Sequence, residues 1–75
     1  MSQAALEEKV LKKLEGGNRM SIPELCRAVK EKDEYNMLRV IAELEDSGDA
    51  MLNGFDRIYR EDGGAIYLAK YSKKS

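Results

Sequence analysis

The stretch MSIPELCRAVKEKDEYNMLRVIAELEDSG, residues 20–48, contains the local signals that decide the fold. Ser21 and Glu24 have the spacing of a capping box, in which two side chains bind each other's backbone N–H groups at a helix start. Pro23 falls in the first turn, where a missing N–H does no harm. We therefore expect a helix that begins near Ile22.

The second half of this stretch predicts another helix, over residues 34–46. Asp33 is a suitable N-cap, and Ser47-Gly48 is a stop signal. One side of the helical wheel collects the apolar residues expected to face the core, Met37, Leu38, Ile41 and Leu44. The opposite side has Tyr35, Asn36, Arg39, Glu43 and Asp46. Val40 lies at the margin, where we expect partial exposure.

Residues 3–15 predict a further helix at the beginning of the chain. Their apolar residues recur at helical spacing, namely Leu6, Val10, Leu11 and Leu14. Ser2 is the expected N-cap, and Gly16-Gly17 is expected to end the helix.

After Gly48 the sequence changes to the pattern of a β-hairpin. Residues 50–60 and 65–71 are predicted strands, with an interruption at Asn53-Gly54. A three-residue loop over residues 62–64 pairs the side chains better than a two-residue loop does. It places these pairs opposite each other: Ile58 with Leu68, Tyr59 with Tyr67, Asp56 with Lys70, and Phe55 with Tyr71.

Both faces of this hairpin are substantially apolar. One face holds Ile58, Ile66 and Leu68, and the other holds Phe55, Tyr59, Tyr67 and Tyr71 with Arg57 among them. The aromatic face either packs on the helices or forms a contact patch for a partner, and the sequence favours neither interpretation over the other. If the aromatic face is packed, the isoleucine face is the one left partly exposed.

Composition limits the classes of protein to which this chain can belong. Its 75 residues correspond to one small domain, and 13 basic against 14 acidic residues give a net charge of -1. With no histidine and one cysteine, the usual metal-binding sets of these two residues and the Ser-His and Cys-His catalytic pairs are missing. We expect a cytoplasmic protein that is not an enzyme and that uses no cofactor, metal or membrane.

The order helix, short strand near residues 19–21, helix, helix and hairpin resembles the winged-helix variant of the helix-turn-helix. Two motifs support the resemblance, Met20-Ser21-Ile22-Pro23-Glu24-Leu25 and Leu44-Glu45-Asp46-Ser47-Gly48-Asp49-Ala50. The second is similar to the end of the recognition helix in many small bacterial and archaeal regulators. The resemblance implies an α+β fold, with one winged-helix domain over residues 1–71 and a disordered tail over residues 72–75.

The resemblance also implies double-stranded DNA as a partner and transcription regulation as a role. The third helix would enter the major groove with Tyr35, Asn36 and Arg39 facing the bases. The hairpin and tail would meet phosphates through Arg57, Arg60, Lys70, Lys73 and Lys74.

Local charge argues against strong DNA binding and leaves an alternative open. Residues 33–49 contain six acids and one base, whereas residues 55–75 contain five bases and three acids. The alternative is a winged helix that docks a protein partner, or a second copy of itself. Its contact residues would be the four aromatics of the hairpin, Phe55, Tyr59, Tyr67 and Tyr71.

Overall fold

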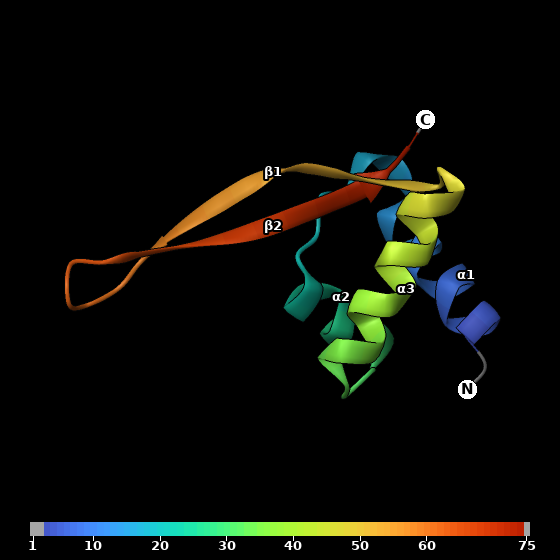
Figure 1. Ribbon diagram of the computed structural model, residues 1–75, viewed down its shortest axis with the longest axis horizontal. Coiled ribbons are helices and arrows are strands. Elements are labelled where there is room, and N and C mark those ends of the chain that lie inside the picture. Colours follow the sequence, from blue (N-terminus) through green and yellow to red (C-terminus); the bar gives the residue numbers. More distant parts are fainter. Residues whose placement is uncertain (1–2, 75) are drawn as a thin grey trace.

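Three α-helices precede a long β-hairpin in the computed structural model, which describes residues 3–74 (Figure 1). The helices are α1 (Gln3–Leu14), α2 (Ile22–Val29) and α3 (Glu34–Ser47), and a short 3₁₀ helix, η1 (Glu15–Gly17), follows α1. Strands β1 (Ala50–Tyr59) and β2 (Ala65–Lys73) pair antiparallel. This α+β order is consistent with winged-helix topology, as the sequence predicts.

The helix starts form where the capping signals place them. Ser21 Oγ accepts a hydrogen bond from the Glu24 N–H at 3.3 Å, and Glu24 Oε1 accepts one from the Ser21 N–H at 3.3 Å. The Asp33 carboxylate accepts from the Tyr35 N–H at 3.0 Å. Gly48 ends α3 with a φ of 84°, a left-handed conformation that favours glycine. The expected N-cap of α1, Ser2, lies outside the described residues.

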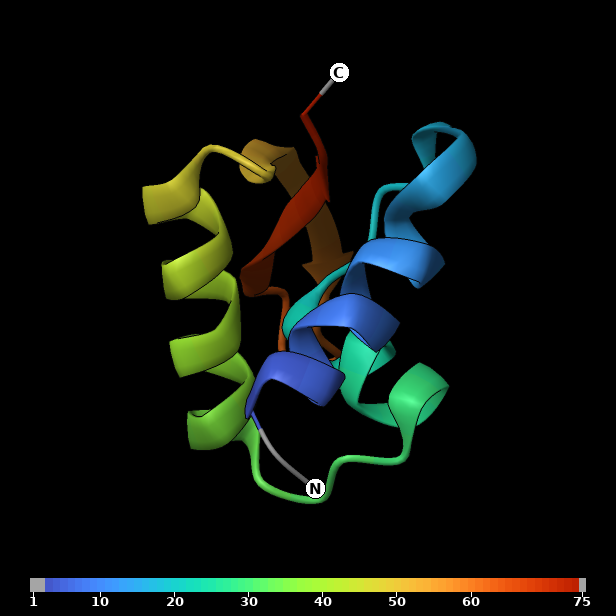
Figure 2. The same ribbon diagram turned by 90° about the vertical axis from the view of Figure 1, so that its right-hand side faces the viewer.

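The core lies between the three helices and the start of β1 (Figure 2). Its buried hydrophobic residues are Leu6, Val10, Leu14, Leu25, Cys26, Val29, Met37, Val40, Ile41, Leu44 and Ala50. Two predictions on α3 are wrong, because Val40 is fully buried and Leu38 is 45% exposed. The buried side of α3 is rotated toward Val40, and the hairpin projects away from the bundle instead of covering Leu38 (Figure 1).

The hairpin register differs by two residues from the expected one. Ile58 lies opposite Ile66 and Arg57 opposite Tyr67. The turn is closed by hydrogen bonds from the Arg60 N–H to the Gly64 oxygen and from the Gly63 N–H to the Arg60 oxygen. Gly63, at φ 90°, takes the left-handed position, so the three-residue loop is 61–63 and not 62–64. A shift of two residues keeps each side chain on its expected face.

The base of the hairpin is anchored to the segment between η1 and α2. Met20 and Tyr71 exchange two backbone hydrogen bonds of 2.9 and 2.8 Å, so the expected strand near residues 19–21 is a single bridge. A bulge between Leu52 and Phe55 occupies the predicted interruption. There Arg19 Nε donates to the Asn53 carbonyl oxygen at 2.8 Å.

The end of the chain differs from the disordered tail that we expected over residues 72–75. Strand β2 continues to Lys73, and Ser72 is buried. The Lys74 N–H donates to the Asp49 oxygen at 3.0 Å, which joins this end to the start of β1. Ser75 lies outside the described residues. Within residues 3–74, every helix is too short or too polar to cross a membrane.

Candidate functional site on the hairpin and helix α3

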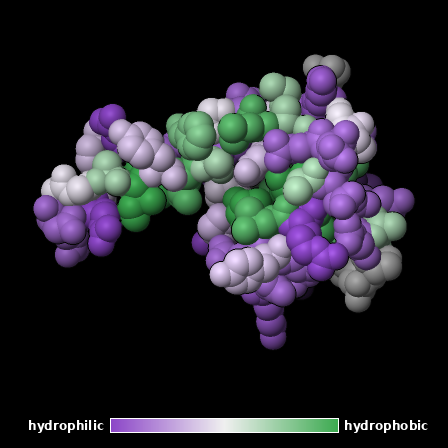
Figure 3. All heavy atoms as spheres, viewed as in Figure 1, coloured by the Kyte–Doolittle hydropathy of each residue, from purple (hydrophilic) through white to green (hydrophobic). Residues whose placement is uncertain are grey.

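The outer half of the hairpin exposes large apolar side chains on both of its faces. They are 45% to 73% exposed, namely Phe55, Ile58, Tyr59, Ile66 and Tyr67. Figure 3 shows hydrophobic residues along this hairpin in one view. The interpretation in which the aromatic face packs on the helices is therefore wrong for three of its four residues. Only Tyr71, at the base, packs against the core, and this burial raises the pKa of its hydroxyl.

Arg57 is held in place on the aromatic face by two tyrosines. Its Nη1 donates to Tyr59 Oη at 2.9 Å, while its Nε and Nη2 donate to Tyr67 Oη at 3.1 and 2.9 Å. The guanidinium carbon lies 5.6 Å from the Tyr59 ring centroid and 5.4 Å from the Tyr67 ring centroid, within range of a cation–π interaction. We call Arg57, Tyr59 and Tyr67 the arginine clamp.

The arginine clamp is a positive charge without an anionic partner. Arg57 forms no ion pair with any carboxylate among residues 3–74. Hydrogen bonds to Tyr59 and then to Tyr67 raise the pKa of Arg57. Three of its five N–H groups are used, and two remain for a ligand. The two tyrosines thus orient the guanidinium on the aromatic face.

Lys70, by contrast, is occupied by the protein itself. Its ammonium donates to Glu24 at the start of α2 and lies 3.2 Å from Asp56 Oδ2 on β1. Lys70 is only 8% exposed, and the hydrogen bond to Glu24 raises the pKa of the lysine. We therefore remove Lys70 from the DNA-contact candidates. It joins the hairpin to α2.

Glu24 is a residue whose second role the sequence did not reveal. Its spacing from Ser21 predicted a helix cap, and the structure adds the contact with Lys70, which is 46 positions away. The Lys70 hydrogen bond, followed by that of the Ser21 backbone, lowers the pKa of Glu24. No local pattern signals a partner at that separation.

The three candidates on α3 are not equally available. Tyr35 is 81% exposed, and Arg39 is exposed without an ion pair among the described residues. Asn36 is half-buried, and its Nδ2 donates to Glu31 Oε2 at 3.0 Å. Two side chains of α3, Tyr35 and Arg39, are thus free to contact a ligand.

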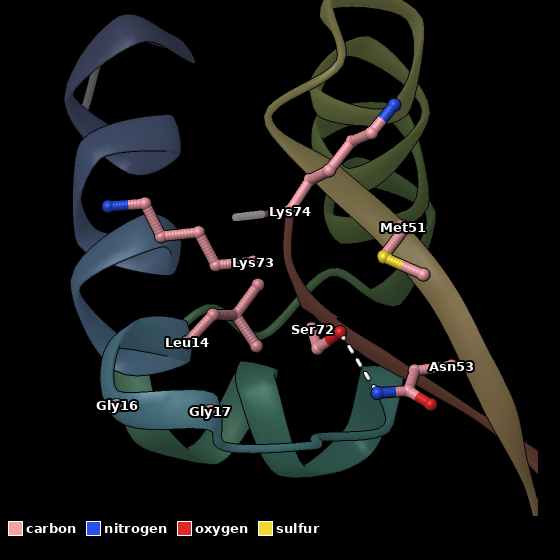
Figure 4. Close-up of a pocket in the computed structure, with 8 residues that line it drawn as sticks. All are labelled: Leu14, Gly16, Gly17, Met51, Asn53, Ser72, Lys73 and Lys74. Carbon is pink, nitrogen blue, oxygen red and sulfur yellow. Dashed lines mark hydrogen bonds between the residues drawn. The ribbon is translucent and has the colours of Figure 1, made fainter.

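The remaining basic candidates lie at the two ends of the hairpin. Arg60, at the tip, is 3.8 Å from Asp62 Oδ2, and both side chains are largely exposed, so this contact is weak. Lys73, at the base, is 3.8 Å from Glu15 Oε1. Lys73 and Lys74 border a hollow of about 490 Å³ beside Gly16 and Gly17, at the end of the hairpin away from its tip (Figure 4).

The structure thus brings the hairpin candidates Arg57, Tyr59 and Tyr67 together and leaves Tyr35 and Arg39 as a separate pair on α3. No known protein family, curated protein or solved structure matches the chain. Three helices followed by an antiparallel hairpin define the class, a small α+β module with a winged-helix-like fold.

Proposed function

We propose that this chain is a winged-helix DNA-binding module, used as a small transcription regulator. The arginine clamp carries the proposal, because two tyrosines orient a guanidinium that has no carboxylate partner within residues 3–74, on a hairpin that projects from the bundle. Arginine suits this use, since its planar donors fit phosphate oxygens and narrow minor grooves. Arg60 at the hairpin tip would extend the contact along the DNA backbone.

Helix α3 would supply the contacts to bases. Arg39 can bind guanine through two hydrogen bonds, and Tyr35 at the start of the helix can contact a base edge or a phosphate. Asn36, the proposed adenine reader, first has to release Glu31. We therefore expect Arg39 to contribute more to sequence preference than Asn36.

The affinity of this interface should be modest and sensitive to salt. Arg57 and Arg60 would neutralise up to two phosphates. This corresponds to a slope of about -2 in log K against log salt. The acidic residues of α3 oppose binding, because residues 33–49 have six acids and one base. Low salt is needed to detect the complex.

An NMR titration with random-sequence duplex DNA tests the proposal. At about 50 mM salt, where phosphate contacts are strong, we expect the amides of residues 33–40 and 55–71 to shift. Arg57→Gln should remove most of the shifts in the hairpin. Arg57→Lys keeps the charge but loses the planar fork, so it should restore them only in part. If no amide in either range shifts at millimolar duplex, DNA binding through α3 and the hairpin is excluded.

A second candidate function is self-association through the hairpin. It is favoured by the five large apolar side chains of the outer hairpin that are 45% to 73% exposed, because clustered exposed apolar residues often mark interaction sites. A second copy of the chain is the partner that we propose, because the basic hairpin of one copy can contact the acidic α3 region of the other. Residues 55–75 have a net charge of +2, and residues 33–49, with exposed Tyr35 and Leu38, have a net charge of -5.

Sedimentation over a range of concentrations tests this second candidate. The double variant Tyr59→Ser plus Tyr67→Ser should reduce association, whereas Ile58→Ser plus Ile66→Ser on the opposite face is the matched control. If the isoleucine variant reduces association more than the tyrosine variant does, the contact lies on the isoleucine face. A wild-type protein that stays monomeric at every concentration contradicts self-association.

A further inference from the structure

A second basic surface lies between α1 and the end of α2. A hollow of about 420 Å³ is lined there by four lysines and two apolar residues, namely Lys9, Lys12, Lys13, Lys30, Ala28 and Val29. We call the four lysines and their apolar floor the lysine hollow. In Figure 2, α1 faces the viewer with α2 beside it, and the hairpin lies behind the bundle. Figure 1 shows the outer half of the hairpin, which carries the arginine clamp, projecting away from α1 and α2, so the two basic surfaces lie on different parts of the molecule.

The charges of the lysine hollow are not neutralised by the part of the chain that the structure describes. None of its four lysines forms an ion pair with a carboxylate among residues 3–74. Glu8 precedes Lys12 by four residues, a favourable helical spacing, yet the two do not pair. Glu15 pairs with Lys73 instead, and Glu31 accepts hydrogen bonds from the residues that begin α3.

Lys30 has a backbone conformation that is unusual for lysine. It ends α2 with φ 59° and ψ 39°, a left-handed position that glycine or asparagine usually occupies. The chain therefore places a long cation at a position where the local backbone favours glycine. This observation is independent of the three lysines on α1 and adds a fourth charge to the same hollow.

The kind of charge in the hollow indicates the kind of ligand. Lysine ammonium groups are flexible point charges, and the hollow has no guanidinium fork among its lining residues. It lies near the C-terminal ends of α1 and α2, so no helix N-terminus offers backbone N–H groups to an anion there. A compact phosphate would find no fixed donors there, whereas an extended polyanion gains from each ammonium by releasing counterions.

We propose that the lysine hollow binds the sugar–phosphate backbone of nucleic acid without sequence preference. Since the lysine hollow shares no residue with α3 or the hairpin, one chain can then hold a second duplex segment while α3 and the hairpin contact the first. Binding by the lysine hollow goes beyond the proposed function and does not depend on it, because the two surfaces use different residues. The two-segment arrangement rests on the proposed function.

Two triple variants of α1 isolate the effect of charge. Lys9→Gln/Lys12→Gln/Lys13→Gln removes three charges, and Lys9→Arg/Lys12→Arg/Lys13→Arg keeps them. All six replacements are good helix formers, so α1 should stay folded in both. With duplex DNA, we expect the amides of residues 9–13 and 28–30 to shift in the wild type and the arginine variant but not in the glutamine variant. The glutamine variant should also reduce the salt slope by about 2 to 3.

Arg57→Gln separates this proposal from the proposed function. If the shifts of residues 9–13 and 28–30 persist in Arg57→Gln, the lysine hollow binds DNA on its own. If duplex DNA shifts only α3 and the hairpin in the wild type, the lysine hollow proposal is overturned and the proposed function stands. If inorganic triphosphate produces the same shifts with equal affinity, the hollow is a small-anion site and the nucleic-acid proposal is likewise overturned.

A capture experiment tests whether one chain holds two segments. Duplex DNA fixed on a surface should retain a second, labelled duplex in the presence of the wild-type protein. The glutamine variant should lose this retention and the arginine variant should keep it. If wild-type protein binds the fixed duplex but retains no second duplex, the two-segment arrangement is refuted.

Discussion

The base and the outer half of the hairpin share alternating apolar and polar residues but have opposite surroundings. At the base, Lys70 and Ser72 are buried and Tyr71 packs on the core. In the outer half, Ile58 and Ile66 face each other across the strands and are nearly half exposed. Polar residues are thus buried where the helices reach, and apolar residues are exposed where they do not. The outer half is the part of the sheet left for a ligand.

Truncating one side chain in the core and one in the outer hairpin should give the largest difference in the free energy of unfolding. Leu25→Ala, in the core against which the hairpin base packs, should lower the free energy of unfolding by about 2 to 5 kcal/mol, because it leaves a cavity in a fully buried site. Ile66→Ala, in the outer half, should lower it by less than about 1 kcal/mol, because water already reaches that side chain. Urea denaturation measures both. Equal losses would mean that the outer half is packed in solution.

Lys70→Met should weaken the link between the hairpin base and α2. It removes the cation from two carboxylates, those of Glu24 and Asp56, which water can still reach in part. We expect a loss of about 1 to 2 kcal/mol in the free energy of unfolding. Chemical shifts should change at Glu24 and Asp56 and stay constant at the hairpin tip. An unchanged unfolding midpoint would show that Lys70 does not anchor the base.

Acid should weaken the same link. The pKa of Glu24 is lowered from its ordinary value of 4.5 in the folded protein, chiefly by the hydrogen bond from Lys70. The resulting stabilisation is complete above the unfolded value of about 4.5 and is lost as the pH falls through the lowered pKa. Glu24→Gln keeps the capping geometry and should flatten this part of the stability profile. Urea midpoints between neutral pH and about pH 3 measure the change.

Tyr67→Phe should affect the arginine clamp without affecting the fold. The tyrosine is 58% exposed, so the free energy of unfolding should change by less than about 0.5 kcal/mol. The Nε proton of Arg57 loses its acceptor and should exchange faster with water. NMR of the arginine side chain measures this exchange, and Tyr35→Phe on α3 is the control. An unchanged rate would mean that the clamp is open in solution.

Cys26, in the helical bundle, gives the smallest expected effect, a change in the reaction rate of its thiol. Burial, followed by the charge of Glu34, raises the pKa of this thiol, which lies in the core. Its reaction with a disulfide reagent should be at least about tenfold slower in the native protein than in denaturant. Equal rates would show that the bundle opens as readily as the exposed hairpin.

Much of the helical part could be predicted from the sequence, because its signals are local. Ser21 with Glu24, Asp33 and Gly48 act within one turn of the residues they cap, and the helix ends follow them. The inward side of α3 was predicted less well. Leu38 and Val40 lie at the two edges of the apolar side, and packing against neighbouring elements decides which edge is covered.

The candidate site was only partly predictable. Arg57, Tyr59 and Tyr67 were placed on one face by strand alternation, which a two-residue error in register does not change. Their mutual hydrogen bonds depend on the register itself, which Gly63 sets by taking the left-handed position. The lysine hollow was missed because its members come from α1 and from the end of α2.

The sequence alone determined the α+β class, the order of the elements, the starts of α2 and α3 and the residues on each hairpin face. These properties depend on capping, periodicity and alternation, which act over a few residues. The tertiary structure decided which basic residues remain free. Lys70 finds Glu24 across 46 positions, whereas Arg57 and the lysine hollow have no carboxylate partner among the described residues. Whether a charge is neutralised depends on distances in space, and these are fixed only when the elements pack.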